Sequence, residues 1–193
     1  MSKQKIFLEI GSSDFDTLLP LARRGWKGCI VEPIPLYAAK LRDAVEEEGL
    51  PVRVIEAAIT THDGEAEMYE CLSRDRQWTR GISHMVEQSG TKLLDLAGNQ
   101  HLKKRKITVR ALRLDTLLSE ICWPRNSEYQ PIDFMKVDIE GHEMDILKSH
   151  TWETHPTMIK IEHKHCDDLE MKRILEYQGY TVWTATDDIY AIR

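Results

Sequence analysis

The sequence has few cysteines and no long hydrophobic run, and both shortages narrow the class of protein. Its four cysteines are scattered along 193 residues and form no C-x-x-C pair. A zinc site built on cysteine and a disulfide framework are therefore not expected. No apolar run approaches the roughly 18 residues needed to cross a membrane, and M-S-K-Q-K leads into a strand-like run without a signal peptide. We expect a cytoplasmic protein with no membrane partner.

An excess of positive charge is also lacking. The formal net charge is −6, so binding to the phosphates of a nucleic acid is not favoured overall. Hydrophobic residues make up 41% of the chain and charged residues 30%, which is typical of a soluble globular protein. The length allows one domain with a single core but not two large domains. We therefore predict one domain over residues 1–193.

The loop after the first predicted strand is poor in glycine. The strand covers residues 6–10, I-F-L-E-I, and the loop G-S-S-D-F-D holds Gly11 alone, followed by Ser12 and Ser13. A pyrophosphate needs a very close approach of the backbone, which the glycines of a full G-x-G-x-x-G motif permit. The loop therefore disfavours NAD, while its backbone N–H groups can still bind polar or anionic groups of another cofactor.

This loop begins a predicted β-α-β unit, which implies a parallel sheet. A helix over about residues 14–22, capped by one of two aspartates, is followed by a strand at residues 29–31 that ends at Glu32. Glu32 follows Gly11 by about twenty residues, the spacing at which an acidic residue accepts hydrogen bonds from the ribose hydroxyls of a nucleotide. A surface carboxylate that ends a strand is the alternative interpretation.

The rest of the chain alternates strands and helices as far as a C-terminal hairpin. The predicted fold class is α/β, with a doubly wound, mostly parallel seven-stranded sheet, a C-terminal antiparallel hairpin and helices on both faces. Asp63-Gly64, between two strand-like segments, indicates a further hairpin. Ala57 and Ala58, near the end of the third strand, either leave room for a flat adenine ring or are ordinary core residues. The later strands are predicted at 52–59, 107–112, 132–137, 158–165, 181–185 and 189–192, and helices at 36–48, 114–118 and 167–178.

Residues 132–148 form the most informative stretch. A short apolar strand changes within a few positions into the acidic turn D-I-E-G-H-E-M-D, after which apolar residues recur at helical spacing. Ligands of an open parallel sheet sit beyond the carboxyl ends of its strands, so Asp138 and Glu140 are candidates for a functional site. Glu143 and Asp145 have an alternative interpretation as a solvated acidic helix start, because carboxylates favour helix N-termini.

This stretch resembles the D-x-E-G-x-E-x-x-x-L signature of the FkbM family of S-adenosylmethionine-dependent methyltransferases. E-I-G-S-S-D at residues 9–14 is similar to the first motif of that family, V-E-P-I-P at 31–35 to its second, and R-L-D-T-L-L at 113–118 to its L-D-x-L-L. The resemblance implies a class I, Rossmann-like methyltransferase (EC 2.1.1.-) that binds S-adenosylmethionine, which has no phosphate and tolerates a loop with one glycine. The expected cofactor-binding residues are Glu9, Gly11, Ser12, Ser13, Glu32, Pro33, Ala57, Ala58 and Asp138.

Methyl transfer from a sulfonium needs an aligned acceptor and a place for the acceptor's proton. The predicted acceptor is a hydroxyl of a small molecule or glycan, whose high pKa calls for a general base or a metal ion. Asp138, Glu162 and His163 could hold a hard divalent cation such as Mg²⁺. The predicted catalytic residues are Asp138, Glu140 and His163, with His142 and His165 as further candidate bases.

The segment from about residue 71 to residue 106 lacks a clear period and is predicted to be a lid or substrate-binding loop. It contains several arginines and Trp78, which could grip an anionic or sugar-like acceptor, and the basic patch H-L-K-K-R-K at residues 101–106. The patch either solubilises the edge of the following strand or supports a second hypothesis, a non-catalytic or nucleic-acid-binding module with the methyltransferase fold. A dehydrogenase is a third hypothesis, which the single-glycine loop disfavours. The sequence leaves open whether the protein forms a homo-oligomer.

Overall fold

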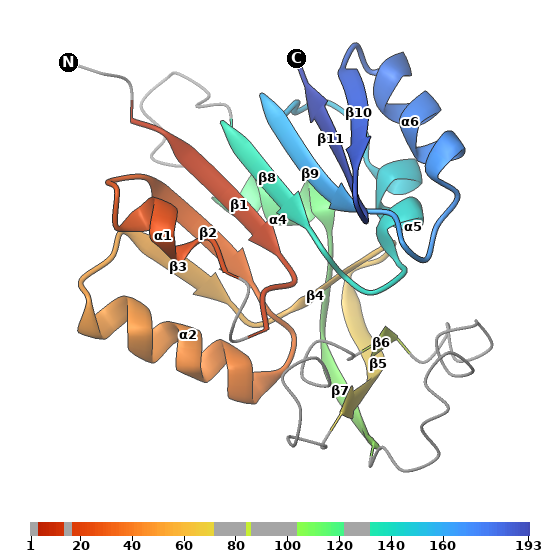
Figure 1. Cartoon of the computed structure of the whole chain (residues 1–193). Helices are drawn as coiled ribbons and strands as arrows, with labels where there is room; N and C mark the ends of the chain where they lie inside the picture. Colours follow the sequence, from red (N-terminus) through yellow and green to blue (C-terminus); the bar gives the residue numbers. More distant parts are fainter. Residues whose placement is uncertain (1–3, 14–16, 72–83, 86–103, 122–131) are drawn as a thin grey trace.

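A twisted, mostly parallel sheet forms the centre of the computed structural model (Figure 1), which describes residues 4–13, 17–71, 84–85, 104–121 and 132–193. The predicted fold class is confirmed. The sheet has seven strands in the order β10-β11-β9-β8-β1-β2-β3, and its C-terminal β10–β11 hairpin is antiparallel to the rest. The strands are β1 (Ile6–Ile10), β2 (Lys27–Val31), β3 (Val52–Ile55), β8 (Phe134–Val137), β9 (Met158–Glu162), β10 (Thr181–Ala185) and β11 (Asp188–Ile192).

The strand order reverses between β1 and β8. The chain passes from β1 to β2 to β3 in one direction and then returns to β8 on the other side of β1. In the parallel register, Ile10 lies opposite both Val31 of β2 and Val137 of β8. The carboxyl ends of these three strands therefore meet at one edge, which is where ligands bind in open α/β sheets.

Helices cover both faces of the sheet because successive side chains of each strand point to opposite faces. Phe7 and Ile30 belong to the core on one face, together with α1 (Leu19–Ala22) and α2 (Pro35–Glu47). Leu8 and Met135 belong to the larger core on the other face. That core is shared with α4 (Leu114–Ile121), α5 (Glu143–Ser149) and α6 (Asp168–Tyr177).

A second sheet, which the sequence analysis did not predict, projects from the first (Figure 1). Its order is β4-β7-β5-β6. Its own small core contains Met68 and Val109. The strands are β4 (Ala58–Thr60), β5 (Gly64–Cys71), β6 (His84–Met85) and β7 (Lys104–Arg113).

Two predictions about this region were wrong. Residues 52–59 form two strands, because the chain leaves the first sheet after Ile55 and β4 then pairs with β7. The Asp63-Gly64 turn is not a hairpin, since β4 and β5 both pair with β7 and not with each other. The Asp63 carboxylate instead accepts hydrogen bonds from the Arg113 N–H (2.9 Å) and the Thr116 hydroxyl (2.9 Å).

The remaining element boundaries agree with the sequence to within a few residues, apart from the first helix. That helix was expected from Asp14 or Asp16, but α1 begins at Leu19, and residues 14–16 lie outside the described ranges. The predicted lid falls largely on residues 72–83 and 86–103, which also lie outside them. In the described ranges, no helix is long and apolar enough to span a bilayer.

Candidate cofactor and acceptor site

Gly11 lies where the ends of β1, β2 and β8 converge. Its N–H donates to the Val31 carbonyl (3.0 Å), and the Asp138 N–H donates to the Ile10 carbonyl (2.9 Å). A Cβ atom on Gly11 would lie 1.8 Å from the Asp138 carbonyl oxygen, and the φ of Gly11 is +76°. Both the close approach of the backbone and the left-handed conformation therefore require glycine at this position.

Glu32 fastens the loop that follows Gly11. One oxygen of its carboxylate accepts hydrogen bonds from the N–H groups of Ser13 (2.7 Å) and Ser12 (3.3 Å). The other oxygen accepts from the Ile34 N–H at 2.8 Å. The Glu32 side chain is buried, so the interpretation of it as a surface carboxylate was wrong. Burial raises the pKa of Glu32 to about 7, against the opposing effect of these N–H donors.

The hydroxyl groups of Ser12 and Ser13 are buried beside Glu32. Neither hydroxyl oxygen has a hydrogen-bond partner among the described residues, and only 3% of Ser12 is exposed. Buried polar groups in proteins are nearly always paired, so two adjacent exceptions need an explanation. A polar ligand at the carboxyl end of β1, which we call the mouth of the strand, would provide the missing partner.

Glu9 is fully buried at the centre of the sheet. Its carboxylate accepts hydrogen bonds from the Leu18 N–H (2.8 Å) and the Thr17 hydroxyl (3.1 Å), and it pairs with the Lys136 ammonium group at 3.3 Å. Burial raises the pKa of Glu9, and the charge of Lys136 acts in the opposite direction. Glu9 therefore ties β1 to the start of α1 and to β8. Sequence reasoning missed Lys136, although it stands directly opposite Glu9 in the parallel register.

The acidic turn after β8 is held by its own glutamate. The Glu143 carboxylate accepts hydrogen bonds from the N–H groups of Ile139 (2.8 Å) and Gly141 (2.9 Å), while Glu140 adopts a left-handed φ of +58°. The Glu143 side chain is buried, so the interpretation of Glu143 as part of a solvated helix start was wrong. Asp145 fits that interpretation, because its side chain is exposed and lies 3.2 Å from Nδ1 of His142.

Carboxylates from the ends of β8 and β9 meet beside this turn. Ligand atoms of Asp138, Glu143 and Glu162 lie within 4.8 Å of one another, as do those of Glu140, Glu162 and His165. Burial, followed by the charges of neighbouring carboxylates, raises the pKa of Glu140 and that of Glu162 to about 8. Oε2 of Glu162 is buried without a hydrogen-bond partner among the described residues. The group can hold protons or a cation near neutral pH.

The structure places two predicted histidines differently from the sequence analysis. The backbone N–H of His163 donates to the Asp187 carbonyl (2.9 Å). The ring Nε2 of His163 lies 3.3 Å from the Thr186 carbonyl oxygen, in the β10–β11 turn. His163 belongs to neither group of adjacent ligand atoms in the described residues. His165, which the sequence offered only as a further candidate base, lies 3.7 Å from a carboxylate oxygen of Glu140.

The other predicted cofactor residues lie close to Glu32 in the chain or within the cores. Pro33 is partly buried between Glu32 and Ile34. Ala57 is buried in the core beneath α4, and Ala58 is buried in the core of the second sheet. Both alanines fit the interpretation as core residues, and contact with an adenine ring stays a prediction.

Two residues of the basic patch, Arg105 and Lys106, are neutralised by the neighbouring strand. Arg105 of β7 donates two hydrogen bonds to the Glu70 carboxylate of β5, and the Lys106 ammonium group lies 2.7 Å from the Glu67 carboxylate. Such cross-strand ion pairs stabilise a sheet surface. They favour the interpretation of residues 105–106 as a solubilised strand, and residues 101–103 lie outside the described ranges.

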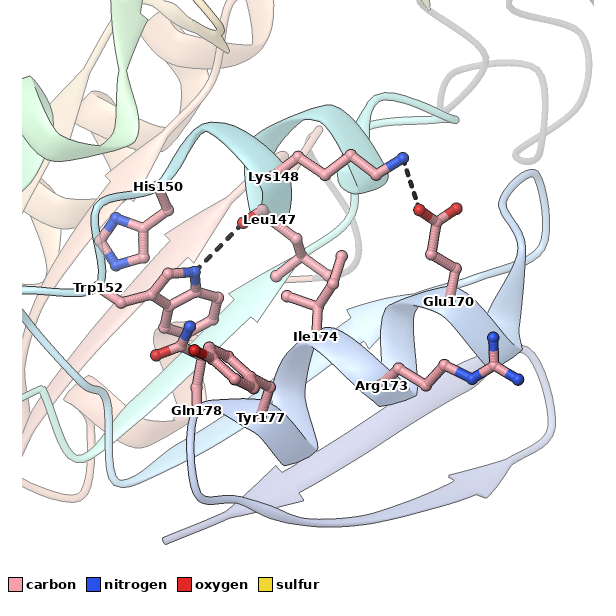
Figure 2. Close-up of a pocket in the computed structure, with 9 residues that line it drawn as sticks. All are labelled: Leu147, Lys148, His150, Trp152, Glu170, Arg173, Ile174, Tyr177 and Gln178. Carbon is pink, nitrogen blue, oxygen red and sulfur yellow. Dashed lines mark hydrogen bonds and ion pairs between the residues drawn. The ribbon is translucent and has the colours of Figure 1, made fainter.

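A groove lies between α5 and α6, away from the strand mouths (Figure 2). Trp152, Ile174 and Tyr177 form its apolar part, and the Trp152 indole N–H donates to the Leu147 carbonyl at 3.3 Å. Lys148 and Glu170 form an ion pair of 2.8 Å across its rim, as Figure 2 shows. None of the lining residues is a predicted cofactor or catalytic residue, so the groove is separate from the site described above.

Comparisons with known proteins identify a family and a fold. The family model of the Methyltransferase FkbM domain matches residues 5–182, and no curated protein matches the sequence. Among solved structures, precorrin-6y C5,15-methyltransferase from Geobacter metallireducens is 13% identical with a TM-score of 0.50, and the match covers 100% of this chain and 80% of that one. This structure shares the class I methyltransferase fold with the chain.

Two further similar structures are complexes with the cofactor or its product. The N-terminal domain of human METTL16, in complex with SAH, is 14% identical with a TM-score of 0.46, over 98% of this chain and 60% of that one. The T. Thermophilus 16S rRNA N2 G1207 methyltransferase RsmC, in complex with AdoMet and guanosine, is 12% identical with a TM-score of 0.46, over 98% and 37%. Neither likeness bears on the acceptor of this chain.

Proposed function

The chain belongs to the FkbM methyltransferase family, and we propose that it transfers the methyl group of S-adenosylmethionine to a hydroxyl group of a small molecule or glycan. The observation that carries the proposal is the arrangement of residues at the mouth of β1 and β8, where the carboxyl ends of these strands meet. There Gly11 packs directly against the Asp138 backbone, beside the buried carboxylate of Glu32. The Ser12 and Ser13 hydroxyls at the same place have no hydrogen-bond partner in the part of the chain that the structure describes.

The residues at this mouth fit the polar parts of the cofactor. Each oxygen of a carboxylate can accept more than one hydrogen bond, so Glu32 can hold the N–H groups of the first loop and accept from ribose hydroxyls as well. The Ser12 and Ser13 hydroxyls can pair with the carboxylate or ammonium group of the methionine part. Glu9 supports this loop from below through Leu18 and Lys136 and acts as a positioning residue.

The acceptor would approach from the side of the acidic turn. S-adenosylmethionine, when bound, supplies a methyl group on a positively charged sulfur. A hydroxyl aligned with that methyl group would lose its proton to a carboxylate of the acidic turn. We assign this role to Asp138 and Glu140, because a pKa of about 8 at Glu140 makes it a stronger base than an ordinary carboxylate.

A divalent cation in this site stays a prediction. Carboxylate oxygens are the ligands that Mg²⁺ prefers. Among the described residues, one candidate group is Asp138, Glu143 and Glu162, another is Glu140, Glu162 and His165, and neither includes His163. Loss of activity after exhaustive chelation, followed by recovery on adding Mg²⁺, would support a cation. Activity that survives chelation excludes a required metal and leaves proton transfer to the carboxylates alone.

We expect Glu32→Gln to weaken binding of S-adenosylhomocysteine by about 10- to 100-fold, because an amide removes the charge and one acceptor beside the ribose. Isothermal titration calorimetry on the folded protein measures the affinity directly. In the native protein the affinity should fall as the pH is lowered through about 7, where Glu32 takes up a proton. Glu32→Gln should remove most of that pH dependence.

Glu47→Gln, at an exposed position of α2, is the matched control and should bind as the native protein does. Native protein that produces no binding heat at high concentration would contradict the proposed function and favour a non-catalytic module. Tight binding that Glu32→Gln leaves unchanged would retain the methyltransferase and remove Glu32 from the cofactor site.

A further inference from the structure

β10 is an edge strand of the seven-stranded sheet and lacks the usual protection of such an edge. Exposed edges are normally blocked by charged side chains, proline or bulges, because their unpaired backbone groups can pair with another chain. The opposite edge, β3, is preceded by Pro51 and carries Arg53. β10 reads T-V-W-T-A, with no charge and no proline, and four of its five residues are exposed.

The free backbone groups of β10 follow from the hairpin. The two-residue turn Thr186–Asp187 places Ala185 opposite Asp188. Residues that flank such a turn form a hydrogen-bonded pair, and the pairs alternate along an antiparallel ladder. Every second residue, from Thr181 through Trp183 to Ala185, therefore directs its N–H and C=O toward β11. The N–H and C=O groups of Val182 and Thr184 face away from the sheet.

We propose that a second copy of this chain pairs with β10 in antiparallel orientation, around a two-fold axis at Trp183. In this register, Val182 of each copy lies opposite Thr184 of the other copy, which gives two hydrogen-bonded pairs. Each pair exchanges two backbone hydrogen bonds, so about four form in total. Trp183 lies opposite the partner's Trp183 in a non-hydrogen-bonded pair, where side chains approach most closely. A two-fold contact uses the same surface on both copies, as the commonest homodimers do.

The side chains next to the edge suit this contact. Trp183 is 43% exposed and stacks on Tyr190, with ring centroids 5.6 Å apart and planes inclined by 13°. Ile192, which is 45% exposed, lies opposite Thr181 on the same face of the hairpin. Figure 1 shows that α1 and α2 cover this face at the β2–β3 end of the sheet and do not reach β10. The paired Trp183 rings would extend the existing stack across the axis.

The composition of β10 favours a second copy over an unrelated partner. The strand carries no charge, and the exposed apolar side chains on this face, Trp183 and the neighbouring Ile192, would meet the same side chains of the partner. A two-fold contact of this kind buries no unpaired charge on either copy.

Sedimentation and light scattering at about 1 to 100 μM protein test the proposal, and we expect a concentration-dependent dimer. Thr184→Pro removes an outward-facing N–H without touching the β10–β11 ladder and should weaken the dimer by about tenfold or more. Thr184→Ala keeps the N–H and should leave the dimer intact. Circular dichroism confirms that both variants fold.

A native protein that stays monomeric up to about 100 μM would overturn the proposal. So would a dimer that Thr184→Pro leaves unchanged, because it would form through another surface. None of these results depends on cofactor binding.

Discussion

Gly11→Ala is expected to abolish cofactor binding and to destabilise the fold. The added Cβ would lie 1.8 Å from the Asp138 carbonyl oxygen and 3.2 Å from a methyl group of Ile139. Neither backbone segment can retreat, because Gly11 and Asp138 are hydrogen-bonded to the neighbouring strand ends. The ends of β1 and β8 must separate. We expect a loss of about 3 kcal/mol or more of unfolding free energy and an affinity for S-adenosylhomocysteine at least about a hundredfold lower.

Gly25→Ala is the matched control for this prediction. Gly25 also has a left-handed φ, +88°, but a Cβ atom there would meet nothing within 4 Å. The control therefore separates the cost of the backbone conformation, about 1 kcal/mol, from the cost of the clash. Urea denaturation and calorimetry on both variants provide the comparison. Equal losses of stability, with cofactor affinity intact in Gly11→Ala, would show that the β1–β8 mouth is not the binding site.

The sequence was sufficient to predict the seven-stranded sheet and the loops that form the mouth, but not the second sheet. Gly11, Glu32 and Asp138 each follow a short apolar run, and parallel strands must bring such carboxyl ends to one edge. This inference depends on strand direction and not on side-chain contacts. For that reason it survives errors such as the missed break after Ile55, where the chain passes from one sheet to another.

The sequence could not show what the buried carboxylates bind. Glu32 and Glu143 hold the backbone N–H groups of tight turns, and the path of those turns depends on single left-handed residues such as Glu140. Local sequence does not determine which N–H group a carboxylate meets. The choice between His163 and His165 is similar, since the path of the chain over the two residues after His163 decides which ring lies beside Glu140.

Lys136 provided a signal that could have been used. F-L-E-I and F-M-K-V are two apolar runs predicted as strands, and each carries one charged residue at its third position. A lone charge in a buried strand needs a partner of opposite sign, because an unpaired buried charge is costly. Adjacent parallel strands in that register place Glu9 opposite Lys136, as the structure confirms.

We expect Lys136→Met to destabilise the protein by about 3–5 kcal/mol, because it leaves the Glu9 carboxylate buried without its counter-charge. The loss should depend on pH. The folded pKa of Glu9 is already raised above the ordinary value and should rise further when Lys136 is absent. A carboxylate of this kind stabilises the fold least when ionised, so stability should be highest at low pH and fall as pH rises from the ordinary pKa of a glutamate toward the folded pKa. Urea denaturation at pH 5 and pH 8 measures the difference.

The double variant Glu9→Gln/Lys136→Met tests whether the ion pair itself is the cause. Neutral groups of similar volume remove both charges, and replacing a complete buried ion pair in this way is often neutral or stabilising. We therefore expect the double variant to regain most of the stability lost by Lys136→Met and to lose its pH dependence. The amide that replaces the Glu9 carboxylate can still accept a hydrogen bond from the Leu18 N–H, so the start of α1 should stay in place. A double variant as unstable as Lys136→Met would mean that packing around Lys136, and not the charge of Glu9, holds β1 against β8.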